Sequence, residues 1–168
     1  MTDLAIRFAR ADDVPTILAF IRELAEYERL ADEVTADEAQ LRATLFGVRP
    51  AAEVLIAELS GAPVGFALFF PNYSTFLGKP GLYLEDLFVR PAARGKGVGA
   101  ALMSACARIA VQRHYGRFEW SVLDWNEPAL RFYASLDAKP QSEWTVHRLV
   151  GRPLYELAER WPHPIGRT

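Results

Sequence analysis

The sequence has few of the residues that build disulfides and metal sites. Its 168 residues include one cysteine, Cys106, which excludes a disulfide within the chain and a cysteine-based metal site. Cys106 shares a predicted helical face with Leu102 and Ile109, a pattern typical of a small core residue. The three histidines are scattered and lack the spacing of metal ligands, so we predict no metal.

Long apolar runs and a large net charge are lacking as well. The longest purely apolar stretch, residues 66–71, is far too short to cross a bilayer. Residues 1–8 lack a basic start followed by a long apolar run, so we predict no signal peptide and a cytoplasmic location. The net charge of −2 argues against general nucleic-acid binding. We therefore expect neither a membrane nor a nucleic acid as a partner.

What the chain does contain is typical of one globular domain. Apolar residues make up 51% and charged residues 24%, and we predict a single domain over residues 4–168. The charge is segregated: residues 23–38 carry seven acids and one base, and residues 90–117 carry six bases and no acid. Two solvated faces of opposite sign would explain this. So would a cationic ligand at the first stretch and an anionic one at the second.

Periodicity and turn residues predict an α/β fold with the order β-α-α-β-β-β-α-β-α-β, a mixed sheet with helices on its faces. The predicted strands are residues 6–8, 54–59, 64–70, 82–89, 118–123 and 144–150. The predicted helices are residues 14–25, 35–45, 98–115 and 126–136, with a short terminal helix at 153–161.

Local signals set the expected boundaries of these elements. Asp12 or Asp13 should cap the first helix, Thr35 and Glu38 match a capping box for the second, and Asn126 should cap the fourth. A hairpin is expected at residues 60–61, and residues 72–81 are predicted to be a loop.

A glycine-rich loop lies between the strand at 82–89 and the helix that follows. Gly95, Gly97 and Gly99 let the backbone approach a ligand, and the free N–H groups of the helix start point toward it. Such a site suits an anion, and a diphosphate in particular. Arg94 and Lys96 add positive charge.

Two other interpretations of this loop are weaker. The pattern from Gly95 to Ala100 also fits a loose dinucleotide fingerprint, with Glu119 at the expected distance, which would indicate a nucleotide-dependent oxidoreductase. In that fold, however, the strand runs directly into the first glycine, whereas residues 91–94 intervene here and three predicted strands come earlier. A plain helix start would explain one glycine but not three alternating ones.

The segment Arg-Gly-Lys-Gly-Val-Gly-Ala at residues 94–100 resembles the coenzyme A pyrophosphate loop of the GCN5-related N-acetyltransferase (GNAT) superfamily. Further segments are similar, in the same order, to the diamine (spermidine/spermine) N-acetyltransferase branch and its thialysine-acetylating relatives. They are residues 21–28, 65–67, 78–79, 82–89 and 125–133. The Leu-Glu-Asp-Leu-Phe-Val and Trp-Asn-Glu-Pro motifs at 84–89 and 125–128 are the most specific. The resemblance covers residues 5–150 approximately.

This resemblance implies a GNAT fold with a splayed sheet and direct acetyl transfer from acetyl-CoA to a small cationic amine in a ternary complex. It also implies a homodimer. The cofactor-binding residues it implies are Leu87, Phe88, Val89, Arg94, Gly95, Lys96, Gly97, Val98, Gly99, Ala100, Asn126 and Tyr133. The substrate-binding residues it implies are Tyr27, Glu28, Phe76, Glu85 and Asp86.

Two catalytic roles follow from the same resemblance. An alkyl amine is almost fully protonated at neutral pH, so the reaction gains from a general base, which we expect to be Glu85 acting through water. Neighbouring residues on a strand face opposite sides, so Glu85 and Asp86 can share a face only at a bulge. Asp86 would support Glu85, although either acid could instead pair with an arginine. Tyr133 would protonate the departing thiolate, whereas a tyrosine on an amphipathic helix is otherwise a core residue.

The acceptor remains open at this stage. Phe76 stands where the diamine enzymes have a tryptophan, and residues 80–81 lengthen the same loop by one residue. Polyamines, thialysine and other short amines are all compatible with the acidic stretch. A non-catalytic CoA-binding or regulatory module and a protein or peptide N-acetyltransferase are the alternatives.

Overall fold

The computed structural model describes residues 3–161, 163 and 165. They divide into two compact units, Met1–Ser121 and Val122–Thr168, each described here by itself. The last residues of the predicted domain, 166–168, lie outside the described part of the chain.

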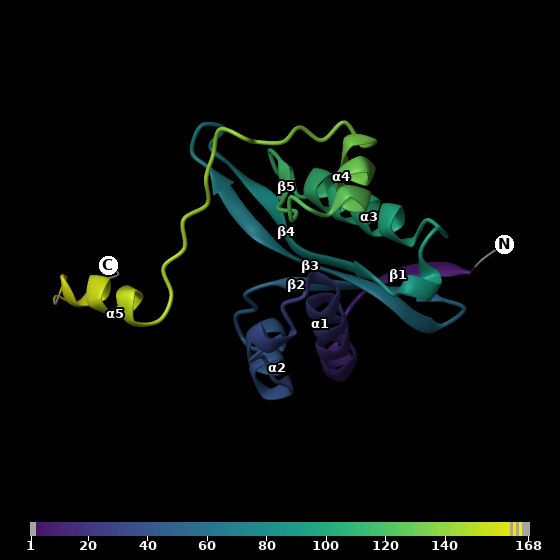
Figure 1. The fold of residues 1–168 in the computed structure, drawn as a ribbon, viewed down its shortest axis with the longest axis horizontal. Coiled ribbons are helices and arrows are strands. Elements are labelled where there is room, and N and C mark those ends of the chain that lie inside the picture. The colour runs from purple at the N-terminus through teal and green to yellow at the C-terminus, as the bar shows by residue number, and fades with distance from the viewer. Residues whose placement is uncertain (1–2, 162, 164, 166–168) are drawn as a thin grey trace. The chain divides into compact units, whose positions relative to one another are not determined.

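The first unit is a five-stranded mixed sheet with helices on both faces (Figure 1). Its strands, β1 (Leu4–Phe8), β2 (Glu53–Leu59), β3 (Ala62–Ser74), β4 (Lys79–Val89) and β5 (Phe118–Trp120), lie side by side in chain order. The first four pair antiparallel, and β5 joins β4 in parallel. Helices α1 (Val14–Glu28) and α2 (Glu38–Phe46) cover one face, and α3 (Val98–Gln112) covers the other. The predicted α/β fold class is confirmed.

Apolar residues from both faces of the sheet are buried beneath these helices. On the α1–α2 face, Phe20 stacks on Phe66 with ring centroids 5.4 Å apart, and Phe88 packs against Phe20. On the α3 face, Leu102 and Cys106 are fully buried. Burial raises the pKa of the Cys106 thiol to about 12, so it is an inert core group, as its helical face predicted.

The predicted loop over residues 72–81 is wrong, because β3 and β4 continue into it. The two strands pair as far as Ser74 and Lys79, which leaves residues 75–78 as the turn. Asn72 lies in the ladder, and its amide donates to the Glu119 carboxylate of β5 at 2.7 Å. That partner is 47 residues away, so the local turn signal of an asparagine could not reveal it.

Other boundaries also differ from the sequence signals. The capping box of α2 is formed by Asp37 and Gln40, each accepting from the other's backbone N–H, and not by Thr35 and Glu38. Asp13 stands at the N-cap of α1 but makes no side-chain cap bond. Helix α3 and strand β5 each end three residues before the predicted position.

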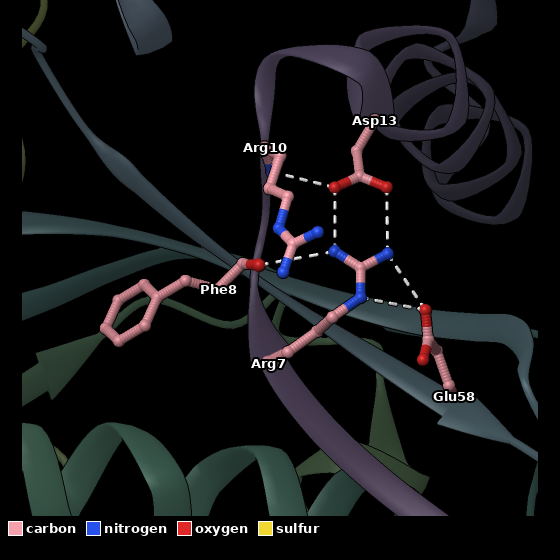
Figure 2. Close-up of polar contacts among 5 residues, drawn as sticks. All are labelled: Arg7, Phe8, Arg10, Asp13 and Glu58. Carbon is pink, nitrogen blue, oxygen red and sulfur yellow. Dashed lines mark hydrogen bonds and ion pairs between the residues drawn. The ribbon is translucent and has the colours of Figure 1, made fainter.

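The Asp13 carboxylate belongs to a hydrogen-bonded cluster that joins β1, β2 and the start of α1 (Figure 2). The Arg7 guanidinium donates to both Asp13 oxygens at 2.7 and 2.9 Å, and to Glu58 at 2.9 Å. Arg10 N–H donates to Asp13 as well, at 2.7 Å. The hydrogen bond from Arg7 holds the pKa of Asp13 below its usual value, so this pair stabilises the fold at neutral pH and weakens as Asp13 becomes protonated in acid.

The second unit contains α4 (Glu127–Ala134) and α5 (Arg152–Glu159). Asn126 caps α4 as predicted, accepting from Ala129 N–H at 3.4 Å, and α5 corresponds to the predicted terminal helix. The predicted strand over residues 144–150 is wrong: within the described chain these residues join no sheet. Trp144 and Val146 alternate as a strand would, but they are 76% and 79% exposed. Alternation cannot supply the hydrogen-bonding partner that a strand requires.

Among the residues described, none of the helices combines the length and the apolar character needed to span a bilayer.

Candidate active site

The sheet opens partway along β4. β5 pairs with β4 only at residues 82–84, whereas β4 continues to Val89 with β3 on its other side. Beyond Leu84, therefore, the edge of β4 that faces away from β3 has no strand beside it in the described sheet. This is the splay that the resemblance implied.

Alternate residues of β4 offer their backbone to the open edge. Arg90 N–H donates to Val64 O at 2.9 Å, so these two residues form a hydrogen-bonded pair across β3 and β4. Pairing alternates along an antiparallel ladder, so Phe88 also bonds to β3, and Leu87 and Val89 direct their N–H and C=O groups away from it. Leu87 and Val89 thus direct backbone groups to the open edge, and their contact with the cofactor stays a prediction, whereas Phe88 contributes a ring that is only 4% exposed.

The glycine loop follows directly on this edge and leads into α3. Gly95 and Gly97 have φ angles of +72° and +79°, and a Cβ on either would meet nothing within 4 Å. Gly97 is the N-cap of α3. A Cβ on Gly99 would lie 3.9 Å from the Val89 side chain, so the first turn of α3 lies beside the end of β4.

These features fit a ligand with an extended amide-bearing arm and a diphosphate. The arm can hydrogen bond to the outward backbone groups of Leu87 and to Val89 N–H, as an added strand would, while Val89 O accepts from Arg94 Nε at 3.0 Å. The diphosphate can lie at the N-terminus of α3, where the loop leaves space and the exposed Lys96 adds charge.

A β-bulge lies at the position where the sheet opens. Leu84 pairs with Phe69 and Asp86 pairs with Leu68, so Glu85 is an extra residue without a partner in β3. Leu68 and Phe69 are neighbours on opposite faces, and Leu84 and Asp86 therefore face opposite sides as well. Asp86 lies on the α1–α2 face with Leu68, which packs against that core. The strict alternation that would separate Glu85 from Asp86 is thus broken.

Two acids near the bulge, Asp86 and Glu28, are in an unfavourable environment for charge. Burial, then the nearby Glu85 and Glu28 charges, raise the pKa of Asp86 to about 6. Burial also raises the pKa of Glu28, the last residue of α1. Glu85 is exposed. Neither Glu85 nor Asp86 forms an ion pair with an arginine or lysine in the described chain, which disfavours the alternative that they are structural acids.

The two oppositely charged stretches of the sequence partly pair with each other. Arg90 donates to Glu23 of α1 at 2.7 and 3.0 Å, and its guanidinium lies 4.7 Å from the centroid of the Phe20 ring. Arg113 pairs with Glu53, and Arg117 pairs with Glu119. Half of the six bases are therefore used in ion pairs within the fold. Arg90 was not predicted to link β4 to α1, although the charge segregation was a signal for it.

The remaining predicted site residues lie in different parts of the chain. Tyr27 is next to Glu28 on α1, and the Arg94 guanidinium lies 4.8 Å from its ring centroid. Phe76 is 95% exposed in the β3–β4 turn. A strand rises about 3.3 Å per residue, so Lys79, the first residue of β4, lies about 20 Å from Glu85. Phe76 lies in the turn before Lys79, and it is therefore distant from the acids of the same chain.

Asn126 and Tyr133 belong to the second unit. Asn126 is 9% exposed and caps α4, and Tyr133 lies on α4 with its ring 5.4 Å from that of Phe132. Their predicted contacts with the cofactor stay predictions.

The open strand, the glycine loop and the partly buried acids beside them fit a protein that takes an extended, anionic cosubstrate. Residues 17–137 match the acetyltransferase (GNAT) family. A thialysine N-epsilon-acetyltransferase from Sus scrofa is 39% identical, over 94% of this chain and 99% of that protein. An L-ornithine N5-acetyltransferase from Arabidopsis thaliana is 36% identical, over 90% of this chain and 86% of that protein. An integron cassette protein from the mobile metagenome of V. cholerae superposes with a TM-score of 0.79 at 27% identity, covering 95% and 99% of the two chains.

The chain belongs to the GNAT family of acetyltransferases, in the diamine acetyltransferase-like branch that includes the thialysine acetyltransferases.

Proposed function

We propose that residues 4–168 act as one domain that transfers the acetyl group of acetyl-CoA directly to a small amine, without a covalent enzyme intermediate. The observation that carries the proposal is the bulge in β4, which groups Glu85 and Asp86 with Glu28 beside the open edge. This group of carboxylates, of which Asp86 and Glu28 are partly desolvated, attracts a cationic acceptor, and the acids at the bulge lie next to the backbone groups that suit the pantetheine arm. Of the cofactor residues expected from the sequence, Leu87, Val89 and the loop at 95–100 are best supported by this geometry.

The proposed chemistry uses groups of this chain for each proton. Glu85, exposed at the bulge, takes a proton from the bound ammonium through water, which leaves a neutral nucleophilic amine. A nitrogen–carbon bond then forms at the thioester carbonyl as the carbon–sulfur bond breaks. Tyr133 gives its phenolic proton to the departing sulfur, and the second proton lost from nitrogen returns to the phenolate by way of solvent. Asp86 and Glu28 hold the positively charged acceptor.

For the acceptor, we propose a short compound with more than one amino group, either a diamine or polyamine or a thialysine-like amino acid. Thialysine and ornithine, the acceptors named for two relatives, each carry a side-chain amine and an α-amine. The acids at residues 28, 85 and 86 suit such a substrate better than the single amine at a protein end. A basic peptide therefore serves as the comparison for the protein-acetylating alternative.

The first experiment is thiol release from acetyl-CoA with a panel of amines: thialysine, ornithine, lysine, putrescine, spermidine, spermine and a basic peptide. Turnover on thialysine or ornithine alone would indicate an amino-acid acceptor. Preferred turnover on spermidine or spermine would indicate a polyamine enzyme. Tight acetyl-CoA binding without turnover on any amine would contradict the proposal and favour a non-catalytic module.

Replacing Tyr133 by Phe should lower kcat by at least about tenfold, because a general acid contributes about two orders of magnitude or more. Glu85→Gln should lower kcat most at neutral pH and less at pH 9, where more of the amine is already neutral. Steady-state rates between pH 6 and 9.5 test both variants. Tyr73→Phe, at a 60% exposed position, is the matched control and should change nothing. An unchanged rate for Tyr133→Phe would make that tyrosine a core residue.

We propose that the enzyme is a homodimer and that the stretch 144–150, with α5, takes part in the interface. Large apolar side chains are exposed throughout this segment, namely Trp144, Val146, Leu149, Val150, Leu154, Leu157 and Trp161. Exposed apolar groups at such density are typical of an interaction surface. Sedimentation equilibrium should give twice the mass of the 18.8 kDa chain, and Val146→Asp should lower it. A monomeric wild-type protein at micromolar concentration would contradict this proposal.

A further inference from the structure

Arg94 is the first residue of the glycine loop, and its side chain contacts the acceptor side of the site. Its Nε donates to Val89 O at 3.0 Å. Its guanidinium lies 4.8 Å from the centroid of the Tyr27 ring and 5.9 Å from that of Phe88. A cation is attracted to the face of an aromatic ring. The three contacts therefore fix the Arg94 guanidinium relative to the Tyr27 ring and the end of β4.

These contacts join two parts of the site that are far apart in sequence. Val89 ends the strand whose open edge suits the pantetheine arm. Tyr27 precedes Glu28, whose charge acts on Asp86 at the bulge. One arginine therefore connects the cofactor strand to the end of α1 that carries the acceptor residues.

A second arginine fixes α1 two turns earlier. Arg90 binds Glu23 and lies over Phe20, seven residues before Tyr27 on the same helix. The contacts of Arg90 hold the middle of α1, so the position of its last turn depends on other contacts. The helix ends directly after Glu28, because Arg29 has a left-handed φ of 63°. Among these contacts, the one from Arg94 reaches the Tyr27 ring.

We propose that Arg94 is a positioning residue that holds Tyr27, and through it the acceptor end of α1, against the open edge of β4. This proposal rests on the proposed function and assigns Arg94 to amine binding. The sequence pattern had placed it at the diphosphate. Loss of its side chain should therefore weaken the amine more than acetyl-CoA.

Steady-state kinetics with both substrates varied separate the two roles. Arg94→Gln should raise KM for the best amine about three- to tenfold, the effect of losing one cation–π contact and one hydrogen bond. Its kcat and its KM for acetyl-CoA should stay within about twofold of wild type, because binding and not chemistry is affected. Lys96→Gln makes the same charge change in the same loop and should instead raise KM for acetyl-CoA. Arg94→Lys keeps the charge but not the planar fork, and it should fall between wild type and Arg94→Gln.

A double-mutant cycle tests whether Arg94 acts through Tyr27. Tyr27→Leu should raise KM for the amine, and adding Arg94→Gln to it should raise KM no further. In Tyr27→Phe, which keeps the ring, Arg94→Gln should still have its full effect. Effects that multiply in the Leu background, or an Arg94→Gln variant that changes only KM for acetyl-CoA, would overturn the proposal.

The coupling between Arg94 and Tyr27 can also be measured without turnover. It is obtained from the unfolding free energies, in urea, of wild type, Arg94→Gln, Tyr27→Leu and the double variant. A non-zero coupling supports the contact, and additive effects would refute it. This measurement stands even if the wild-type protein acetylates no amine of the panel, a result that would count against the proposed function alone.

Discussion

Gly97→Ala should raise KM for acetyl-CoA by at least about tenfold, the loss expected when one hydrogen bond to a charged group is blocked. Gly97 caps α3 with a φ of +79°, and a Cβ there would meet no protein atom within 4 Å. The added methyl group would instead occupy the space that we assign to the diphosphate. The fold should survive, because the left-handed conformation costs a non-glycine residue only about 1–2 kcal/mol.

Gly61→Ala is a matched control for this experiment. Gly61 lies in the β2–β3 turn with the same φ of +79°, and a methyl group added there would also meet no atom within 4 Å. Both variants should lose a similar amount of unfolding free energy, measured in urea, but only Gly97→Ala should change KM for acetyl-CoA. Equal KM values in the two variants would mean that the loop does not bind the diphosphate.

Asp86→Asn should make the protein more stable and less active. Burial and two neighbouring acids raise the pKa of Asp86 from an ordinary 3.8 to about 6. Between these values the folded state holds a proton that the unfolded chain has lost, so stability falls as the pH rises from about 4 to above 6. Asparagine carries no charge to desolvate. At pH 8 the variant should gain about 1–3 kcal/mol, at 1.36 kcal/mol per pKa unit.

Calorimetry across pH can measure this gain. The melting temperature of Asp86→Asn should exceed that of wild type by about 3–8 °C at pH 8, and the difference should vanish below about pH 4. The same variant should lose about tenfold or more in kcat/KM for the amine, as when a hydrogen-bonded charge is removed. Asp137→Asn, at an exposed left-handed position that asparagine tolerates, should change neither quantity. A Tm difference that is independent of pH would contradict the assigned charge state of Asp86.

The sequence could predict the elements whose signals are local. The apolar stripe of α1, the glycines before α3 and the Asn126 cap of α4 each specify their own structure, and all three appear where expected. The resemblance added the splayed sheet, which the short pairing of β5 bears out.

Features that depend on distant partners could not be predicted. Asn72 carries a turn signal but lies in β3, because Glu119 on another strand accepts its amide hydrogen bond. Asp13 is a residue type typical of helix caps, yet its carboxylate accepts hydrogen bonds from Arg7 instead of from the start of α1. For the same reason the stacking of Arg94 on Tyr27 had no counterpart in the sequence pattern, since the two residues are 67 positions apart.

The bulge at Glu85 divides β4 into two halves that keep separate registers with β3. Residues on the hairpin side pair with one offset, and residues 86–89 pair with another. A change of length in the hairpin can therefore be absorbed at the bulge before it reaches Leu87 and Val89. One strand thus joins a hairpin half, where a change of length is tolerated, to an edge half that keeps its pairing with β3. In evolutionary terms, the hairpin can change length while the half of β4 that the proposed function assigns to acetyl-CoA stays in register with β3.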